Sequence, residues 1–542
     1  MKKSFLKSIL PGIILLTSLL SCQTDNQNRT ETSPNIICIV TEDISPWLGC
    51  YWDPVARTPV LDQLAKDGVL FTNFFSVSGV CAPSRAALIT GMYPSTIGAN
   101  NMRTGQKNLP DGIPPYEALP LPEVKCYTEF LRMAGYYCTN NNKEDYQFRA
   151  PKTAWDESSS IAHWRNRPEG KPFFAIFNIG TTHESQVWDR ANDPVVIPPE
   201  KVNLPPYYPD HPVIRRDVAR VYSNITIMDR EVGEFIEQLK KAGLYDKTIV
   251  IFYSDNGGPL PRGKREIYDT GLKVPMIIRF PGNEHAGKVI DDLISFIDIP
   301  ATILSLAGVE IPDYMHGQAF WGDQKATPRD YIYAARDRMD YQYDCRRAVR
   351  DKQYKYIRNY FPDKPRMLPV RYRMNMALMQ TLLEYEKQGK LTGDQLHWFA
   401  KTKPEEELYD ITKDPFELND LSSDEAYADV LVKFRALHEE WVEDFGDHPA
   451  IPEKELVWSM WPNGIQPVTS SPEIHQDGNE ISIVCSTVGA TIGYQVRADQ
   501  QEIKGPWYIF QDPLELNPSD TLVVMAHRIG FKPSEEVLFV QE

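Results

Sequence analysis

Four continuous apolar runs constrain the fold of this chain more than any other feature. They are NIICIV (35–40), PFFAIFNIG (172–180), TIVIFYSDNG (248–257) and VPMIIRFPG (274–282). Such runs are typical of strands that are buried on both faces, as in parallel sheets. Helical patterns alternate with them over residues 127–135, 213–243 and 298–307. The alternation predicts an α/β fold in which helices cover both faces of a large sheet.

The segment after the first run is also expected to be helical. TPVLDQLAKDGVLF (58–71) places Leu61, Leu64 and Val69 at helical spacing. We expect the whole α/β domain to span residues 34–330. Ligands of such folds bind beyond the carboxyl ends of the strands, so the residues that follow the apolar runs are the first candidates for a site.

The pattern changes in the C-terminal part of the chain. A smaller α+β subdomain is expected over residues 331–447, with a strand at YKYIRNY and helices near 372–388 and 425–445. A linker that contains proline and tryptophan (448–467) follows. The tail (468–542) alternates in strand fashion and predicts a small β-sandwich, with strands at EISIVCS, TIGYQVRA, TLVVMAHR and EVLFVQE.

The N-terminus predicts export. Three lysines among the first seven residues precede an apolar run (9–20) that is too short to span a membrane comfortably. The run ends in LLSC, which resembles a bacterial lipoprotein cleavage box with Cys22 as the lipidated residue; an ordinary signal peptide is the alternative. Residues 1–22 would then be the signal peptide and 23–33 a polar tether. We expect an exported protein anchored by lipid at a bacterial membrane, either periplasmic or at the cell surface.

Charge and cysteine content narrow the classes of partner. The formal net charge is −16, which argues against nucleic acid, and an anionic substrate would need a local basic pocket. The eight cysteines contain no C-x-x-C pair and no zinc-finger spacing. We expect most of those other than Cys22 and Cys81 to be free and buried, although the sequence leaves a disulfide among them open.

Oxygen-bearing side chains follow two of the apolar runs. TEDISP (41–46) follows the first, and SDNGG (254–258) closes the third. Carboxylate and amide oxygens suit a hard divalent cation and suit zinc poorly. We expect Ca²⁺ in preference to Mg²⁺, held by Glu42, Asp43, Asp255 and Asn256.

The motif CAPSRAALITG (81–91) identifies a family. Cys-x-Pro-Ser-Arg resembles the signature that directs conversion of a cysteine to formylglycine in type I sulfatases. The rival reading, a phosphatase loop with an arginine six residues after the cysteine, fails because that position is Ala87. Pro83 suits the first turn of a helix, so Cys81 would lie at the positive N-terminal end, where an anion is favoured.

The resemblance implies a fold, a modification and a reaction. The fold would be alkaline-phosphatase-like, with a large mixed sheet between helices. A formylglycine-generating maturation enzyme would oxidise Cys81 to an aldehyde, whose hydrate would bind the metal and attack sulfur. The metal ligands implied are Glu42, Asp43, Cys81, Asp255 and Asn256.

The resemblance also assigns roles to four further catalytic residues. Lys143, in GYYCTNNNKEDYQF, would bridge the sulfate and the aldehyde hydrate. His183, at the end of PFFAIFNIGTTH, would donate a proton to the leaving group. Lys264, in RGKREIYDTGLKVP, would clamp sulfate oxygens, and Arg85 would hold the aldehyde hydrate.

The chain departs from the family pattern at two positions. Asp145 stands where the family has a histidine, so either Asp145 takes over the contact with the nucleophile or that hydrogen bond is weaker or absent. Glu42 stands where an aspartate is usual, which changes reach but not ligand type. Glu184 and Arg103, with Asp145, are expected to contact the substrate.

The expected substrate is a sulfated oligosaccharide. LPPYYPDHPVIRRDVARVYSNITIMDREVG and PLPRGKREIYDTG resemble the heparan N-sulfatase branch, which hydrolyses N-sulfoglucosamine. O-sulfate on host glycosaminoglycans or algal polysaccharides is the alternative within the family.

Two other classes of function compete with a sulfatase. One is a phosphoester hydrolase of the same superfamily; its zinc sites use His and Asp, and none of the 10 histidines lies in TEDISP or SDNGG. The other is a non-catalytic glycan-binding lipoprotein, in which Trp507 and Tyr508 would stack on sugars. The tail also resembles, weakly, the sandwich that follows chitobiase-type glycosidases.

Overall fold

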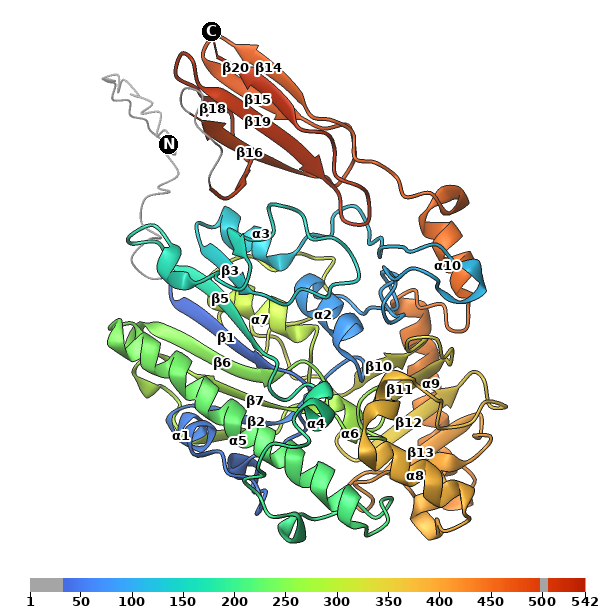
Figure 1. Ribbon diagram of the computed structural model, residues 1–542. Helices are drawn as coiled ribbons and strands as arrows, with labels where there is room; N and C mark the ends of the chain where they lie inside the picture. Colours follow the sequence, from blue (N-terminus) through green and yellow to red (C-terminus); the bar gives the residue numbers. More distant parts are fainter. Residues whose placement is uncertain (1–32, 498–504, 542) are drawn as a thin grey trace, which may run out of the picture. The chain divides into compact units, whose positions relative to one another are not determined.

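A mixed nine-stranded sheet is the main feature of this computed structural model (Figure 1). The strand order is β4-β3-β5-β1-β6-β7-β2-β8, with β9 paired to β2. Neighbours from β4 to β6 are parallel, whereas β7 is antiparallel to both β6 and β2. The strands are β1 (Asn35–Thr41), β2 (Val69–Phe75), β3 (Tyr137–Asn141), β4 (Glu157–Ser158), β5 (Phe173–Ile179), β6 (Thr248–Ser254), β7 (Lys273–Arg279), β8 (Lys288–Ile290) and β9 (Ile294–Ser295).

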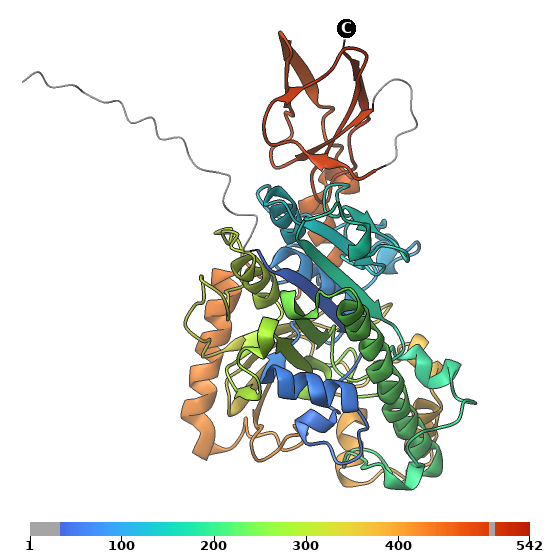
Figure 2. The same ribbon diagram turned by 90° about the vertical axis from the view of Figure 1, so that its left-hand side faces the viewer.

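Helices cover both faces of this sheet, which confirms the predicted α/β class. Residues of β1 alternate between two cores: Ile37 and Ile39 pack with residues of α1 and α5, whereas Ile36 and Cys38 pack with residues of α2, α3 and α7. Figure 2 shows the long helix α5 running beside the strands. The helices are α1 (Pro59–Asp67), α2 (Cys81–Thr90), α3 (Tyr127–Met133), α5 (Pro212–Lys241) and α7 (Asp298–Leu306).

The helix predicted after β1 is shorter than the sequence suggests. It ends at Asp67, and Val69 is the first residue of β2. A side chain at Gly68 would meet the backbone of β7, because an added Cβ would lie 2.4 Å from the carbonyl oxygen of Ile278. The chain therefore turns into the sheet at Gly68, and Val69 belongs to a strand that the helical pattern concealed.

A second, antiparallel sheet follows. Its order is β10-β11-β12-β13, and β12 is the predicted strand YKYIRNY. Phe434 of α9 packs with Val349, Tyr356 and Leu408 of this sheet. The elements are β10 (Ile332–Arg336), β11 (Arg346–Arg350), β12 (Tyr354–Asn359), α8 (Ala377–Lys387), β13 (Glu406–Asp410) and α9 (Ala428–Asp444), and two short helices near the site are α4 (Ser185–Asp189) and α6 (Asp269–Leu272).

The segment expected as a linker contains a helix, α10 (Glu453–Met460), that is bound to the preceding part of the chain. Glu453 accepts two hydrogen bonds from Arg338, at 2.5 and 2.7 Å, and Val457 and Trp461 pack with Tyr116. The described residues from Pro34 onward accordingly form one compact unit. The domain boundaries inferred from composition stay predictions.

The tail forms a β-sandwich of a three-stranded and a four-stranded antiparallel sheet. Ile481, Leu522 and Val524 lie in their shared apolar core. Lys125 Nζ donates a hydrogen bond to Thr491 Oγ1 at 2.8 Å, which links the sandwich to the segment before α3. The strands are β14 (Glu473–Asp477), β15 (Glu480–Val484), β16 (Thr491–Arg497), β17 (Tyr508–Ile509), β18 (Leu514–Glu515), β19 (Thr521–His527) and β20 (Val537–Val540).

The structure describes residues 33–497 and 505–541, so the predicted signal peptide and Cys22 lie outside the described residues. Every cysteine within those ranges is free, in line with the expectation of unpaired thiols. Within the same ranges, no helix combines the length and the hydropathy that a membrane span requires.

Candidate active site

Cys81 is the first residue of α2. Val80 before it is extended, and the Ser84 hydroxyl donates to the Val80 carbonyl at 2.8 Å, which fixes the first turn. Gly91, with φ of 73°, ends the helix by donating its N–H to the carbonyl of Ala87. The Cys81 side chain is buried, and this burial raises the pKa of the thiol to about 12. The thiol is therefore protonated at neutral pH, at a helix end whose free N–H groups favour a negative charge.

The ends of β1 and β6 bring three oxygen-bearing side chains together. The two strands are parallel, with Thr41 opposite Ser254, so the residues that follow them emerge side by side. The Asp43 N–H donates to Asp255 Oδ1 at 3.3 Å, and Asn256 Nδ2 donates to Asp43 Oδ1 at 2.9 Å. All three side chains are fully buried. The sequence prediction of a joint site at these strand ends agrees with this geometry.

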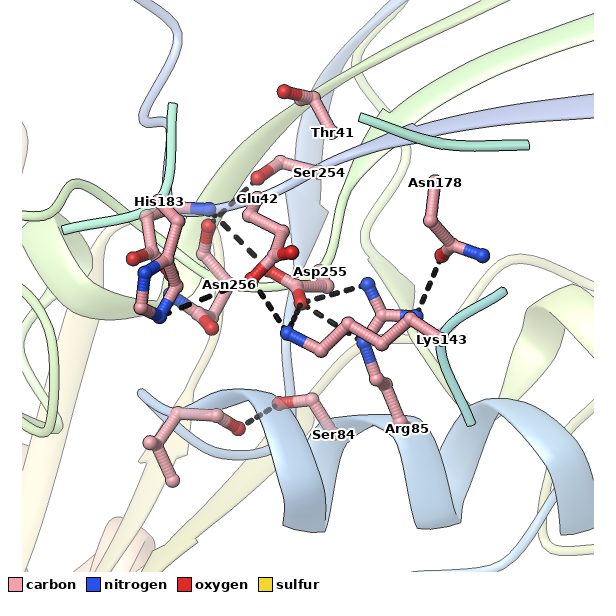
Figure 3. Close-up of polar contacts among 12 residues, drawn as sticks. Thr41, Glu42, Ser84, Arg85, Lys143, Asn178, His183, Ser254, Asp255 and Asn256 are labelled. Atoms are coloured by element: carbon pink, nitrogen blue, oxygen red, sulfur yellow. Dashed lines mark hydrogen bonds and ion pairs between the residues drawn. The ribbon is translucent and has the colours of Figure 1, made fainter. Parts of the chain in front are cut away.

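Two cations reach this cluster from other elements (Figure 3). Arg85, one turn after Cys81 on α2, donates from Nε to Asp255 Oδ2 at 3.0 Å and from Nη1 to Asn178 Oδ1 at 2.7 Å. Lys143, beyond β3, forms an ion pair with Glu42 Oε2 at 2.5 Å and lies 3.9 Å from Asp255 Oδ2. Both residues predicted from the motif therefore face the oxygen cluster.

Lys264 reaches the cluster from the loop after β6. Its Nζ lies 2.6 Å from Asp43 Oδ2 and 3.4 Å from Glu184 Oε1. Burial alone would lower the pKa of Lys264, but Asp43 and Glu184 outweigh it and hold that pKa above its ordinary value. Lys264 therefore carries a positive charge in this buried position.

Glu184 was expected to contact the substrate, but its carboxylate is occupied by protein. Arg265 donates to both of its oxygens, at 2.8 and 2.6 Å, and the side chain is 1% exposed. Its backbone N–H also donates to Asp43 Oδ2 at 2.7 Å. Glu184 therefore helps to position Lys264 and Arg265 through its carboxylate and Asp43 through its backbone N–H.

Asp145 interacts directly with Cys81. The two side chains act on each other's pKa: the Asp145 carboxylate raises that of the thiol, and the thiol lowers that of the carboxyl. Burial would raise the pKa of Asp145, but Lys143, Arg103 and Arg85 lower it below its ordinary value. The influence of Asp145 on Cys81 fits the alternative in which Asp145 takes over the contact of the missing histidine, and that assignment stays a prediction.

His183 follows β5 at the edge of the same cluster. Its Nδ1 accepts the backbone N–H of Ser185 at 3.3 Å, which leaves the proton of a neutral ring on Nε2. That Nε2 lies 3.9 Å from Glu42 Oε2. The loop is fixed because Thr182 Oγ1 donates to the carbonyl of Glu42. His183 therefore presents an N–H toward the site.

The donor set fits a hard divalent cation. Asn256 Oδ1 is buried and has no hydrogen-bond partner among the described residues. Such an oxygen, beside Asp43 and Asp255, is a ligand that Ca²⁺ or Mg²⁺ accepts. No group of three His, Cys, Asp or Glu side chains within residues 33–497 and 505–541 is drawn together in a metal-binding array. Glu42 and Asp43 are instead paired with Lys143 and Lys264.

Three residues of the site escaped the sequence analysis. Asn178 is a polar side chain inside the apolar strand β5, and this contrast was the available signal. Arg265 directly follows Lys264, so a second cation in the same motif could have been singled out. Tyr372, whose ring centroid lies 6.3 Å from that of His183, had no signal because it lies nearly 190 positions away along the chain.

Comparison with known proteins assigns the family. The Sulfatase model matches residues 34–309, and the model described as N-sulphoglucosamine sulphohydrolase, C-terminal, matches residues 262–368. The chain is also 46% identical to an ulvan-active sulfatase of Formosa agariphila, over 93% of this chain and 91% of that protein. The protein belongs to the sulfatase family. It is a sulfuric ester hydrolase, which sets aside a non-catalytic binding protein.

More distant relatives extend this comparison. Human N-sulphoglucosamine sulphohydrolase is 24% identical, over 82% of this chain and 95% of that protein. The phosphonate monoester hydrolase of Agrobacterium radiobacter has a similar structure, with a TM-score of 0.55 and 17% identity, over 76% of this chain and 96% of that one. The likeness to this hydrolase concerns the fold alone. The assignment to the sulfatase family therefore rests on the family model and on the relative that is 46% identical.

Proposed function

We propose that the protein removes O-sulfate groups from ulvan or a closely related algal polysaccharide. The observation that carries this proposal is the 46% identity to an ulvan-active sulfatase, which extends over nearly the whole of both chains. N-sulfoglucosamine, the first substrate suggested by the sequence motifs, is supported by the C-terminal family model and by a relative of only 24% identity. The alternative of an O-sulfated polysaccharide is therefore better supported.

The arrangement of the site supports a division of roles. Lys143 and Lys264 lie on carboxylates of the cluster and would neutralise the oxygens of a bound sulfate. His183 would give the proton on Nε2 to the leaving sugar oxygen. Arg85 would hold Asp255 in place, and Asp145 would orient the group at position 81 by accepting a hydrogen bond from it.

Two groups implied by the family complete this proposal. A formylglycine made from Cys81 would supply the attacking oxygen, and a Ca²⁺ ion would draw electron density from the sulfate. Glu42, Asp43, Asp255 and Asn256, with the modified Cys81, would hold the ion. A hydroxyl of the modified residue would donate a hydrogen bond to Asp145, because a carboxylate accepts such bonds and Asp145 already acts on the group at position 81.

The experiment that tests this proposal compares two substrates. The mature enzyme is incubated with ulvan oligosaccharides and, separately, with N-sulfoglucosamine, and inorganic sulfate is measured by ion chromatography. We expect release from ulvan oligosaccharides and little or none from N-sulfoglucosamine. Release from N-sulfoglucosamine alone would contradict the proposal and favour the sulfamate-hydrolysing branch.

We also propose that the protein is exported and lipid-anchored through Cys22. The support is the LLSC box after a short apolar run and the polar segment that follows it. Metabolic labelling with a fatty-acid analogue should label the full chain and should not label a Cys22→Ala variant. Equal labelling of the two would contradict the anchor.

A further inference from the structure

A pocket of about 600 Å³ lies beside the cluster at Cys81. This size falls in the range of small-molecule and sugar sites. Four segments that are far apart in sequence contribute to it. Its lining includes Arg103, Arg265, Asp340, Tyr341, Arg371 and Tyr372.

Packing places this pocket next to the reacting atoms. Met102 and Met339 belong to the same apolar cluster as Cys81. The next residue after each methionine, Arg103 and Asp340, lines the pocket, so the pocket lies close to Cys81. On the other side, the ring of Tyr372 lies against the ring of His183, at 6.3 Å between centroids. Because His183 is proposed to protonate the leaving sugar oxygen, the sugar must lie on this side of the sulfate.

The charges of the pocket are opposite in sign to those of the whole chain. Arg103 lies 3.9 Å from Asp340, also interacts electrostatically with Asp145 and forms no side-chain hydrogen bond with any described residue. Arg371 is exposed and forms no ion pair or side-chain hydrogen bond with any residue the structure describes. Arg265 is occupied by Glu184. Two arginines are therefore available to a ligand, in a chain whose net charge is −16.

Two tyrosines complete the lining. The side chains of Tyr341 and Tyr372 are 56% and 40% exposed, which is unusual for large aromatic residues beside a buried site. The ring of Tyr372 is held at 5.1 Å from that of Trp188 and meets it edge-on. A fixed, half-exposed aromatic ring offers a flat apolar surface and a hydroxyl, and a sugar ring can use both.

We infer that this pocket binds the sugar unit next to the reacting sulfate and selects a unit that carries a second anionic group, either a carboxylate or another sulfate. Arg371 and Arg103 are the residues that would bind this group, because a guanidinium pairs with such anions through two parallel hydrogen bonds. The inference rests on the proposed function, since it requires that the reacting sulfate belong to a carbohydrate.

The test compares a glycan with a substrate that has no sugar and no second anionic group. Arg371→Gln and Arg103→Gln are assayed on ulvan oligosaccharides and on 4-methylumbelliferyl sulfate. Each substitution should lower kcat/KM for the oligosaccharides about tenfold more than for the aryl sulfate, since a charge-assisted hydrogen bond is lost. Arg230→Gln is the matched control, because Arg230 is an exposed arginine of α5 that lines a different groove.

A chemical treatment of the substrate shows whether the second anionic group is a carboxylate or a sulfate. Ulvan oligosaccharides are assayed before and after reduction of their carboxylates to alcohols. If the group is a carboxylate, reduction should lower kcat/KM for the parent and leave Arg371→Gln nearly unaffected. If it is a sulfate, Arg371→Gln should remain defective on the reduced material.

The outcomes that overturn the inference differ from those that overturn the proposed function. If both arginine variants lose the same factor on oligosaccharide and aryl sulfate, the pocket does not bind a second anionic group. If the parent releases no sulfate from ulvan, the proposed substrate is wrong. The same comparison is then made with sulfated heparin disaccharides with intact or reduced carboxylates, where equal losses again overturn the inference.

Discussion

Three cations of the candidate site are each paired with a carboxylate in the absence of substrate. Lys143 lies on Glu42, Lys264 on Asp43, and Arg85 on Asp255, all within a buried cluster. Buried charges of this kind are expensive unless they are paired, and their retention is typical of a functional site. The pairing fixes the positions of the positive groups, so little reorganisation is needed when a sulfate binds.

The role of His183 predicts a dependence on the leaving group. In His183→Ala, hydrolysis of glycan substrates should fall about 10²–10⁴-fold, because a sugar alkoxide needs a proton to leave. Hydrolysis of 4-methylumbelliferyl sulfate should fall far less, since its phenolate leaves without help. Both rates are measured on one preparation. Equal losses would make His183 a residue that binds sulfate or supports the loop.

The oxygen cluster predicts a calcium-dependent stability. Adding Ca²⁺ to chelator-treated protein should raise Tm, because a ligand that binds only the folded state stabilises it. Asn256→Ala should weaken this response, since Asn256 Oδ1 has no other partner among the described residues. Thermal unfolding with and without Ca²⁺ measures the effect, and elemental analysis gives the stoichiometry. Bound zinc, with no response to Ca²⁺, would contradict the assignment.

At the scale of elements, the sequence predicted what local patterns control. The apolar runs located β1, β5, β6 and β7. The polar side chains after β1 and β6 meet, as the sequence predicted, because parallel neighbours end at one edge. The C-terminal end of α1 was missed because Gly68 turns the chain at its contact with β7. Tyr372 was missed for the same reason, since its neighbour His183 is distant in sequence.

The packing of α8 against α5 predicts a pH dependence of stability. Asp217 of α5 accepts the Leu378 N–H at 2.6 Å, and burial raises its pKa to about 6. The folded state therefore binds a proton more tightly than the unfolded state, so stability is lost as pH rises from about 4 through 6. The loss through this group is about 3 kcal/mol.

Substitution of Asp217 isolates this contribution. Asp217→Asn keeps an acceptor for the Leu378 N–H but does not titrate, so its unfolding free energy should fall less between pH 4 and 7. Asp229, whose pKa burial also raises to about 6, retains a similar slope in the variant. Urea unfolding at a series of pH values measures both proteins. Identical pH profiles would contradict the account of Asp217.

At the scale of the whole molecule, the candidate site is assembled from several segments of one compact unit. Cys81 comes from α2, and the oxygen-bearing side chains follow β1 and β6. The inferred sugar pocket also uses the antiparallel part of the chain after β10. The motif around Cys81 identified the reaction from sequence alone. The residues that we infer to select the glycan could not be identified from the motif, because they come together only in the folded chain.

We propose that the sulfuryl group is transferred to residue 81 after the thiol of Cys81 has been oxidised to an aldehyde. The most direct measurement is the mass of the peptide that contains Cys81, taken from a preparation that releases sulfate from its glycan substrate. We predict a mass in which the CH₂SH group of Cys81 has become CHO, in a fraction that rises with the specific activity. A fully active preparation in which Cys81 carries only the intact thiol would contradict the account.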